Sequence, residues 1–140
     1  MPLVRIELHE NYSAEAARKI ADEIHHAIVH VLGIPPRDRF QILNRLAGGS
    51  IIAEDAGLGF ERSNGVIVIQ IFTQRGRADD VKRQLYAEIA SGLATLGVGG
   101  EDVFIGFQEN GPQDWSFGFG RAQYLTGELA VPSLSAPAGN

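Results

Sequence analysis

The sequence predicts an α/β (α+β) fold in which two βαβ repeats form a four-stranded mixed sheet with two helices on one face. Three observations support this prediction. Residues 32–40 resemble residues 96–104 without a gap, a helical pattern of apolar residues precedes each of these segments, and a strand pattern precedes each helix. The repeat units therefore lie near residues 1–46 and 65–108.

The first unit opens with a strand over residues 3–9, where apolar and polar residues alternate. Apolar residues then recur at spacings of three and four, which predicts an amphipathic helix; they are Ala17, Ile20, Ala21, Ile24, Ile28, Val31 and Leu32. Ser13 is suited to cap the start of this helix, and Gly33 is suited to end it. A second strand is expected over residues 40–46.

The second unit follows the same order. Residues 66–73 are almost wholly apolar, which predicts a strand buried on both faces. The next helix has apolar residues at helical spacing, namely Leu85, Tyr86, Ile89, Leu93 and Leu96, and Gly97 is placed to end it. A strand over residues 103–108 completes the unit. Right-handed crossovers would put both helices on the same face of the sheet.

The opposite face of this sheet is then left uncovered. Because a large apolar patch in water favours association, we expect the bare faces of several copies to pack together. The sequence therefore predicts a symmetric homo-oligomer, and specifically a homotrimer.

Two segments lie outside the repeats. Residues 47–64 are rich in glycine and are expected to form loops or a short hairpin. Residues 109–132 form a C-terminal loop segment with clustered aromatic residues, and residues 133–140 are expected to be a flexible tail. The whole chain, residues 1–140, is predicted to be a single domain.

Composition excludes several function classes. Hydrophobic residues make up 44% of the chain, enough for a packed core. There is no cysteine, which excludes disulfides and thiol nucleophiles. The net charge of −5 argues against nucleic-acid binding, which needs a basic surface. We find no apolar run long enough to span a membrane and no apolar core of a signal peptide after Met1, so a cytoplasmic protein is expected.

Beyond these patterns, the chain resembles a known family. A Met-Pro start runs directly into a strand, and two strand–helix–strand units follow with an arginine-bearing turn in mid-chain. Together these features resemble the tautomerase superfamily and, within it, the malonate semialdehyde decarboxylase subgroup. The segments that carry the likeness are residues 35–41, 54–60, 74–77, 114–118 and 121–129.

The resemblance implies a trimer of βαβ repeats whose catalytic group is the amine of Pro2, exposed once Met1 is removed. It also implies catalytic roles for Asp38 and for an arginine of the 75–77 turn. Members of the family carry one or two arginines there, so Arg77 is the first choice and Arg75 the second. An apolar wall that binds the substrate is implied at four further positions, namely Trp115, Phe117, Tyr124 and Leu129. Neither a cofactor nor a metal is expected.

The protonation state of Pro2 would decide which reaction occurs. A free α-amino group has a pKa of roughly 7.7–8.0, so nearby charges can shift it across neutrality. Asp38 would favour the protonated amine, a general acid, whereas Arg75 and Arg77 would favour the neutral amine, a base or nucleophile. The sequence supplies both signs of charge and leaves the choice open.

Three functions follow from these residues. The first is cofactor-independent decarboxylation of malonate semialdehyde or a similar small 3-oxo acid. The second is keto–enol tautomerisation of a 2-oxo acid such as phenylpyruvate, with a related hydration of unsaturated 2-oxo acids in which Asp38 activates water. The third is a binding protein without catalytic activity on the same scaffold, because fold does not determine function.

Overall fold

Two strand–helix–strand units follow one another along the chain in the computed structural model, which describes residues 1–131. The predicted tail, residues 133–140, lies outside the described residues. The first unit comprises β1 (Leu3–His9), α1 (Ala14–Leu32) and β2 (Phe40–Leu46). The second comprises β3 (Ile67–Gln74), α2 (Asp79–Ala94) and β4 (Val103–Asn110). Three short helical turns accompany them: η1 (Gly100–Asp102), η2 (Pro112–Asp114) and α3 (Gln123–Thr126).

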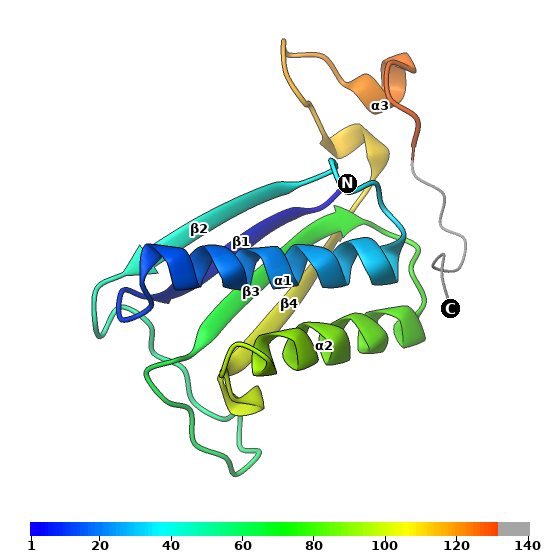
Figure 1. Cartoon of the computed structure of the whole chain (residues 1–140). Coiled ribbons are helices and arrows are strands. Elements are labelled where there is room, and N and C mark those ends of the chain that lie inside the picture. The colour runs from blue at the N-terminus through cyan, green and yellow to red at the C-terminus, as the bar shows by residue number, and fades with distance from the viewer. Residues whose placement is uncertain (132–140) are drawn as a thin grey trace.

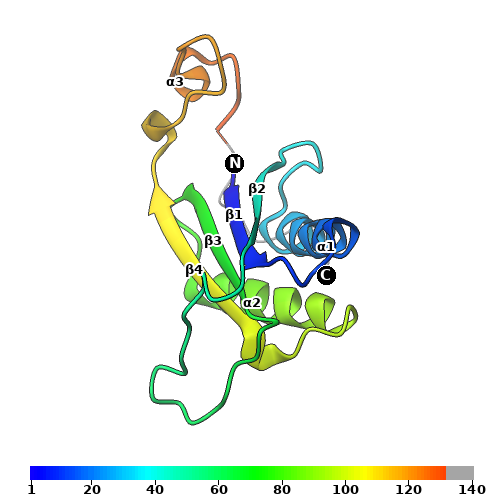
Figure 2. The ribbon, with the colours of Figure 1, turned by 90° about the vertical axis from the view of Figure 1, so that its left-hand side faces the viewer.

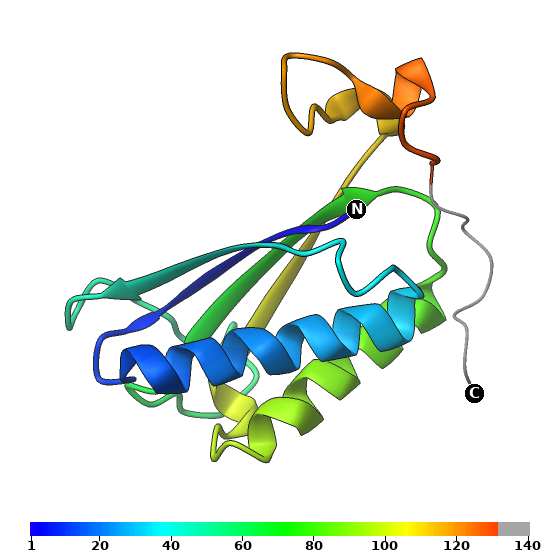
Figure 3. The same cartoon turned by 45° about the horizontal axis from the view of Figure 1, so that its top comes forward.

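The four strands form one mixed sheet in the order β2-β1-β3-β4. β1 is parallel to β2 and antiparallel to β3, while β3 is parallel to β4. Both long helices lie side by side on one face of the sheet (Figures 1 and 3). This arrangement confirms the predicted fold class. It also makes β1, the strand that carries the N-terminus, an interior strand that is paired on both sides.

The core lies between the helices and the sheet. Alternate residues of β1 and β3 are buried, together with the apolar stripes of α1 and α2. The fully buried larger side chains include Ile6, Leu8, Ile24, Ile28, Ile67, Ile69, Ile71, Leu85, Ile89 and Leu93. Burial of each such side chain is worth about 1.5–3 kcal/mol. This packed layer holds the ends of β1 and β3 rigidly, which matters for any site built there.

α1 ends where the sequence predicts, whereas α2 ends two residues before Leu96, the last position that the apolar pattern assigns to it. Ser13 caps α1 by accepting a hydrogen bond from the Ala16 N–H, and Gly33 ends it with φ of 67°. α2 stops at Ala94, but the turn that follows it closes at Gly97. There the Val98 N–H donates to the Leu93 carbonyl while Gly97 has φ of 86°, the geometry of a Schellman cap.

Each repeat has an aspartate at the equivalent position, and the two aspartates make different contacts. Because β1 and β3 are antiparallel, the turn before β2 and the turn before β4 lie at opposite ends of the sheet. Asp38 belongs to the first turn and Asp102 to the second. Asp102 is buried and accepts hydrogen bonds from both the N–H and the hydroxyl of Ser63, which anchors the long loop. The carboxylate of Asp38 instead lies 3.4 Å from the amine of Met1.

Residues 47–64 form a loop that projects from one end of the sheet (Figure 1). The predicted alternative of a short hairpin does not occur, because no residue of this segment is in a strand. The Asp55 carboxylate instead organises a turn by accepting from the N–H groups of Gly57 and Gly59. Within residues 1–131, no helix is long and apolar enough to cross a membrane.

Candidate active site

Pro2 lies at the start of the interior strand β1, and it is buried. The structure includes Met1, so the nitrogen of Pro2 is an amide in it and the free amine belongs to Met1. Met1 is only 3% exposed, and its amine lies 3.4 Å from Oδ2 of Asp38. Consecutive Cα atoms are about 3.8 Å apart, so removal of Met1 would leave the free amine on Pro2 in the same neighbourhood.

Strand pairing places Asp38 beside the terminal amine. In the parallel pair of β1 and β2, Leu3 lies opposite Phe40, so the turn before Phe40 flanks the residues before Leu3. The turn is closed by a hydrogen bond of 2.9 Å from the Asp38 N–H to the Pro35 carbonyl. The Asp38 side chain is 16% exposed, so its carboxylate interacts with the amine in a partly desolvated environment.

Arg77 reaches the same end of the sheet from the other side. β3 is antiparallel to β1, with Phe72 opposite Leu3, so the chain that follows Phe72 passes the N-terminus. The Arg77 side chain is buried. Its Nη1 donates to the carbonyl of Gln74 at 3.0 Å and to Oγ1 of Thr73 at 3.3 Å.

The second terminal nitrogen of Arg77, Nη2, is buried and has no hydrogen-bond partner among the described residues. Burial lowers the pKa of Arg77 from its ordinary value, while Glu109 and Tyr124 oppose that effect. The guanidinium nevertheless stays charged, because an arginine side chain does not deprotonate in proteins. A buried donor without an acceptor is costly, so this nitrogen is suited to bind an anionic group beside the amine.

Arg75 is placed differently. Its side chain is exposed, and its backbone N–H donates to the carbonyl of Asn110. Lys82 is the main cause that lowers the pKa of Glu109, and Arg75 contributes a smaller part. Among the arginines, Arg77 and not Arg75 affects the pKa of the terminal amine. Within the described residues, the structure thus brings Arg77 together with Asp38 and the terminal amine. The Arg75 side chain is exposed to solvent outside this group.

The terminal amine experiences opposing influences. Burial is the largest of them and lowers the pKa of the Met1 amino group. The Asp38 carboxylate raises this pKa and the Arg77 cation lowers it. Although Asp38 lies within ion-pair distance, the net direction is downward, because the cost of desolvating the ammonium and the repulsion from Arg77 together outweigh the attraction.

The C-terminal segment with η2 and α3 lies near the N-terminal end of β1 (Figures 1 and 2), and it carries a cluster of aromatic side chains. The rings of Trp115 and Phe117 are stacked with centroids 6.2 Å apart, and Phe117 meets the edge of Tyr124 at 5.2 Å. Phe40, at the start of β2, joins this cluster through Phe117 at 6.0 Å. Leu129 is exposed and continues the same segment.

Tyr124 connects this cluster to the charged groups. It is buried, and burial together with the charge of Asp38 raises its pKa to about 12, while Arg77 acts in the opposite direction. Its hydroxyl therefore stays protonated at any ordinary pH. The phenol can donate a hydrogen bond to a ligand held near Asp38 and Arg77.

Phe40 is a member of the cluster that is not among the residues predicted for the site. The signal available in the sequence was its position two residues after Asp38, at the first position of a strand that pairs with β1. In the part of the chain that the structure describes, its repeat counterpart Phe104 has no ring contact with another aromatic residue, although the Arg62 guanidinium lies over its ring. The internal repeat therefore does not predict that Phe40 joins the aromatic cluster.

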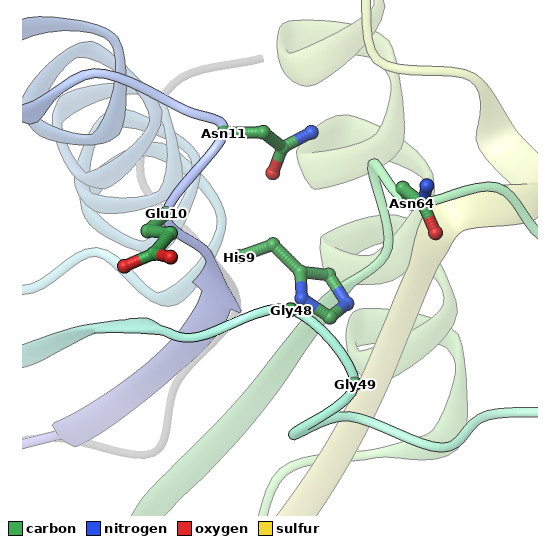
Figure 4. A pocket seen from close by; sticks show the side chains of 6 residues that line it. All are labelled: His9, Glu10, Asn11, Gly48, Gly49 and Asn64. Carbon is green, nitrogen blue, oxygen red and sulfur yellow. The ribbon is translucent and has the colours of Figure 1, made fainter.

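A separate hollow of about 390 Å³ lies at the far end of β1 (Figure 4). It is lined by His9, Glu10, Asn11, Gly48, Gly49 and Asn64. Seven residues of strand at about 3.3 Å each separate it from Pro2 by roughly 20 Å, so it belongs to a different end of the molecule. Within residues 1–131, no group of three His, Cys, Asp or Glu residues is arranged to hold a metal ion.

Comparison with known families and proteins gives consistent matches. A family model described as "Tautomerase enzyme" matches residues 38–118, and a second model with the same description matches residues 2–61. The chain is 35% identical to the probable tautomerase YrdN of Bacillus subtilis (strain 168) over 92% of this chain and all of that protein. It is 34% identical to the probable tautomerase YusQ of the same strain over 89% of this chain and 99% of that protein.

Solved structures extend the likeness. The crystal structure of FG41 malonate semialdehyde decarboxylase inhibited by 3-bromopropiolate superposes with a TM-score of 0.90 at 57% identity, covering 93% of this chain and 99% of that one. A second malonate semialdehyde decarboxylase, whose structures address decarboxylase and hydratase activities, gives 0.86 at 32% identity over 91% and 99%. A fused 4-OT symmetric trimer, at 20% identity over 89% and 98%, shares the fold with a TM-score of 0.72.

Proposed function

This chain belongs to the tautomerase family, and from that premise we propose that it is a cofactor-independent decarboxylase of malonate semialdehyde or a similar small 3-oxo acid. One observation carries the proposal. A buried terminal amine, the Asp38 carboxylate and an Arg77 nitrogen that has no hydrogen-bond partner among residues 1–131 meet at one end of the sheet. The 57% identity to FG41 malonate semialdehyde decarboxylase supports the choice of substrate.

In the proposed reaction Arg77 binds the substrate carboxylate. Binding a charge that disappears as the bond breaks stabilises the ground state, and this alone does not accelerate the step. The useful contribution is orientation, because a held carboxylate keeps the breaking C–C bond aligned with the carbonyl π system. The two contacts that fix Nη1, to Gln74 and Thr73, leave Nη2 free for this task.

Pro2, freed of Met1, acts on the aldehyde carbonyl. Its protonated amine donates a hydrogen bond to the carbonyl oxygen, which accepts electron density as carbon dioxide leaves. As carbon dioxide leaves, the amine transfers its proton to this oxygen and an enol forms. The enol then takes up a proton at carbon and returns its oxygen-bound proton to the amine, which gives acetaldehyde and consumes one proton for each carbon dioxide released. Asp38 favours this cationic form of the amine. The wall of Trp115, Phe117 and Tyr124 limits solvation of the carboxylate and so favours its loss as a neutral molecule.

A second candidate function has its own support. Burial and Arg77 both lower the pKa of the terminal amine, which favours a neutral amine. A neutral Pro2 is a base, suited to keto–enol tautomerisation of a 2-oxo acid such as phenylpyruvate. Hydration of an unsaturated 2-oxo acid is a related alternative, supported by the relative at 32% identity whose structures address a hydratase activity.

The deciding experiment mixes the purified protein with malonate semialdehyde and follows acetaldehyde, with phenylpyruvate and 2-oxo-3-pentynoate assayed in parallel. Intact-protein mass measured beforehand establishes whether Met1 has been removed. Acetaldehyde formation with kcat/KM well above that for the other two substrates supports the decarboxylase. The absence of acetaldehyde at high protein concentration would refute it, and preferential turnover of phenylpyruvate would favour the tautomerase.

The pH profile of an Asp38→Asn variant tests the role of the amine. Asp38 raises the amine pKa, so its removal is expected to lower that pKa. If cationic Pro2 is required, activity is present below the amine pKa and is lost as pH rises through it. The alkaline limb of kcat/KM for malonate semialdehyde should therefore move to lower pH in the variant, while the maximum also falls. A limb that stays in place would show that Asp38 does not act on the Pro2 amine.

We further propose that the protein is a homotrimer. The face of the sheet opposite the helices carries partly exposed apolar side chains, including Phe40, Ile42 and Phe104, the last 49% exposed. Packing of this face against other copies would remove these groups from water. Light scattering coupled to size exclusion should give three times the 15.1 kDa chain mass. A monodisperse monomer at micromolar concentration would contradict the trimer.

A further inference from the structure

Asn110, the last residue of β4, makes hydrogen bonds to both sides of the candidate active site. Its backbone carbonyl accepts from the N–H of Arg75 at 2.7 Å, at the start of the turn that carries Arg77. Its side-chain Oδ1 accepts from the indole Nε1–H of Trp115 at 2.8 Å. One residue thus connects the arginine turn to the aromatic cluster.

We propose that Asn110 is a positioning residue that orients Trp115 and, through it, the aromatic wall of the site. The contribution to catalysis rests on the proposed function, whereas the orientation of Trp115 does not. An indole N–H is a donor only, so a half-buried tryptophan needs an acceptor to hold one ring orientation. Within the described residues, the side chain of Asn110 supplies that acceptor.

The orientation of Trp115 is passed on by ring contacts. Trp115 stacks on Phe117 with an angle of 11° between the ring planes, and Phe117 meets the edge of Tyr124 at 87°. Tyr124 in turn lies within the electrostatic influence of both Asp38 and Arg77. Rotation of the indole would therefore disturb a packed series of rings that ends beside the charged groups.

The side chain of Asn110 can be changed without releasing the arginine turn. The contact to Arg75 uses the backbone carbonyl of Asn110, which every residue possesses. The neighbouring Glu109 independently holds the turn, because its carboxylate accepts from the Gly76 N–H at 3.2 Å and pairs with Lys82 at 3.0 Å. Substitution at position 110 therefore acts on Trp115 selectively.

The experiment compares Asn110→Leu, which removes the acceptor at similar volume, with Asn110→Asp, which keeps an acceptor oxygen. Trp115 is the only tryptophan, so intrinsic fluorescence reports on it alone. For Asn110→Leu we expect a shifted emission maximum, increased quenching by acrylamide and a fall in kcat/KM of about 3- to 10-fold, the usual effect of one lost hydrogen bond. Asn110→Asp should restore the wild-type emission and quenching.

A double-mutant cycle with Trp115→Phe separates positioning from any other role. Phenylalanine has no N–H, so Asn110→Leu should have little further effect on kcat/KM in that background. An undiminished effect there, or unchanged fluorescence in the single variant, would overturn the proposal. If the wild-type protein forms no acetaldehyde, the decarboxylase proposal fails, and the fluorescence comparison still decides whether Asn110 orients Trp115.

Discussion

Replacement of Pro2 by alanine is expected to lower kcat for malonate semialdehyde by roughly 10²- to 10⁴-fold, the range that a positioned general acid or base contributes. Alanine keeps an α-amino group, but a primary amine is less basic than a secondary one and its backbone is free of the proline ring. A smaller fraction of the amine would therefore be protonated near neutral pH, and the donor at the start of the chain would be less fixed. Steady-state assay of acetaldehyde formation measures the change.

A chain that retains Met1 is the sharper comparison. In it the Pro2 nitrogen is an amide that can neither be protonated near neutral pH nor attack a carbonyl, while every other side chain is unchanged. Met1 is also buried beside Asp38 and within the electrostatic reach of Arg77, the two side chains that the proposed reaction uses. Such a chain, made with an N-terminal extension and checked by mass, should have no measurable activity. Activity close to that of the processed chain would rule out the Pro2 amine as the reacting group.

Substitution of Arg77 by glutamine is expected to lower kcat/KM by about 100-fold or more. A hydrogen bond that involves a charged group is worth about 1.5–3 kcal/mol, and loss of two such contacts, one from each N–H of Nη2 to the carboxylate, corresponds to that factor or a larger one. Arg77→Lys keeps the charge but loses the planar fork, so it should recover only part of the activity. Kinetics of all variants are measured with one substrate and one buffer.

Arg75→Gln is the matched control, because it removes the same type of side chain two residues away in the same turn. Since Arg75 is exposed and does not affect the pKa of the terminal amine, its loss should change kcat/KM less than about threefold, as is usual for a surface substitution. Arg77 is buried and holds Gln74 and Thr73, so unfolding curves must accompany the kinetics. Equal losses in the two variants would refute the assignment of the carboxylate to Arg77 alone.

The contrast between these arginines shows what the sequence could not predict. Arg75 and Arg77 flank Gly76, and nothing in their spacing tells which one is buried. Gly76 has φ of 116°, a conformation that other residues adopt at high cost. The turn made there exposes Arg75 and buries Arg77, a difference that the sequence alone does not reveal.

Phe40 and Asn110 lie outside the predicted site for a similar reason. Strand periodicity predicts which face a residue occupies but not which distant segment packs against it. Phe40 contacts Phe117, far along the chain, and Asn110 contacts Trp115 only because the chain turns through η2. Neither contact has a local signature.

By itself the sequence determined the two βαβ units, both ends of α1 and the position of Pro2 at the head of a strand. These follow from hydrophobic periodicity, from capping residues and from glycine, which act over a few neighbouring residues. Only the tertiary structure decided that Asp38 and Arg77 meet at the N-terminus and that Asp102 instead anchors a loop. Those outcomes depend on the register of β1 between a parallel and an antiparallel neighbour, and register is set by packing between segments that are distant in the chain.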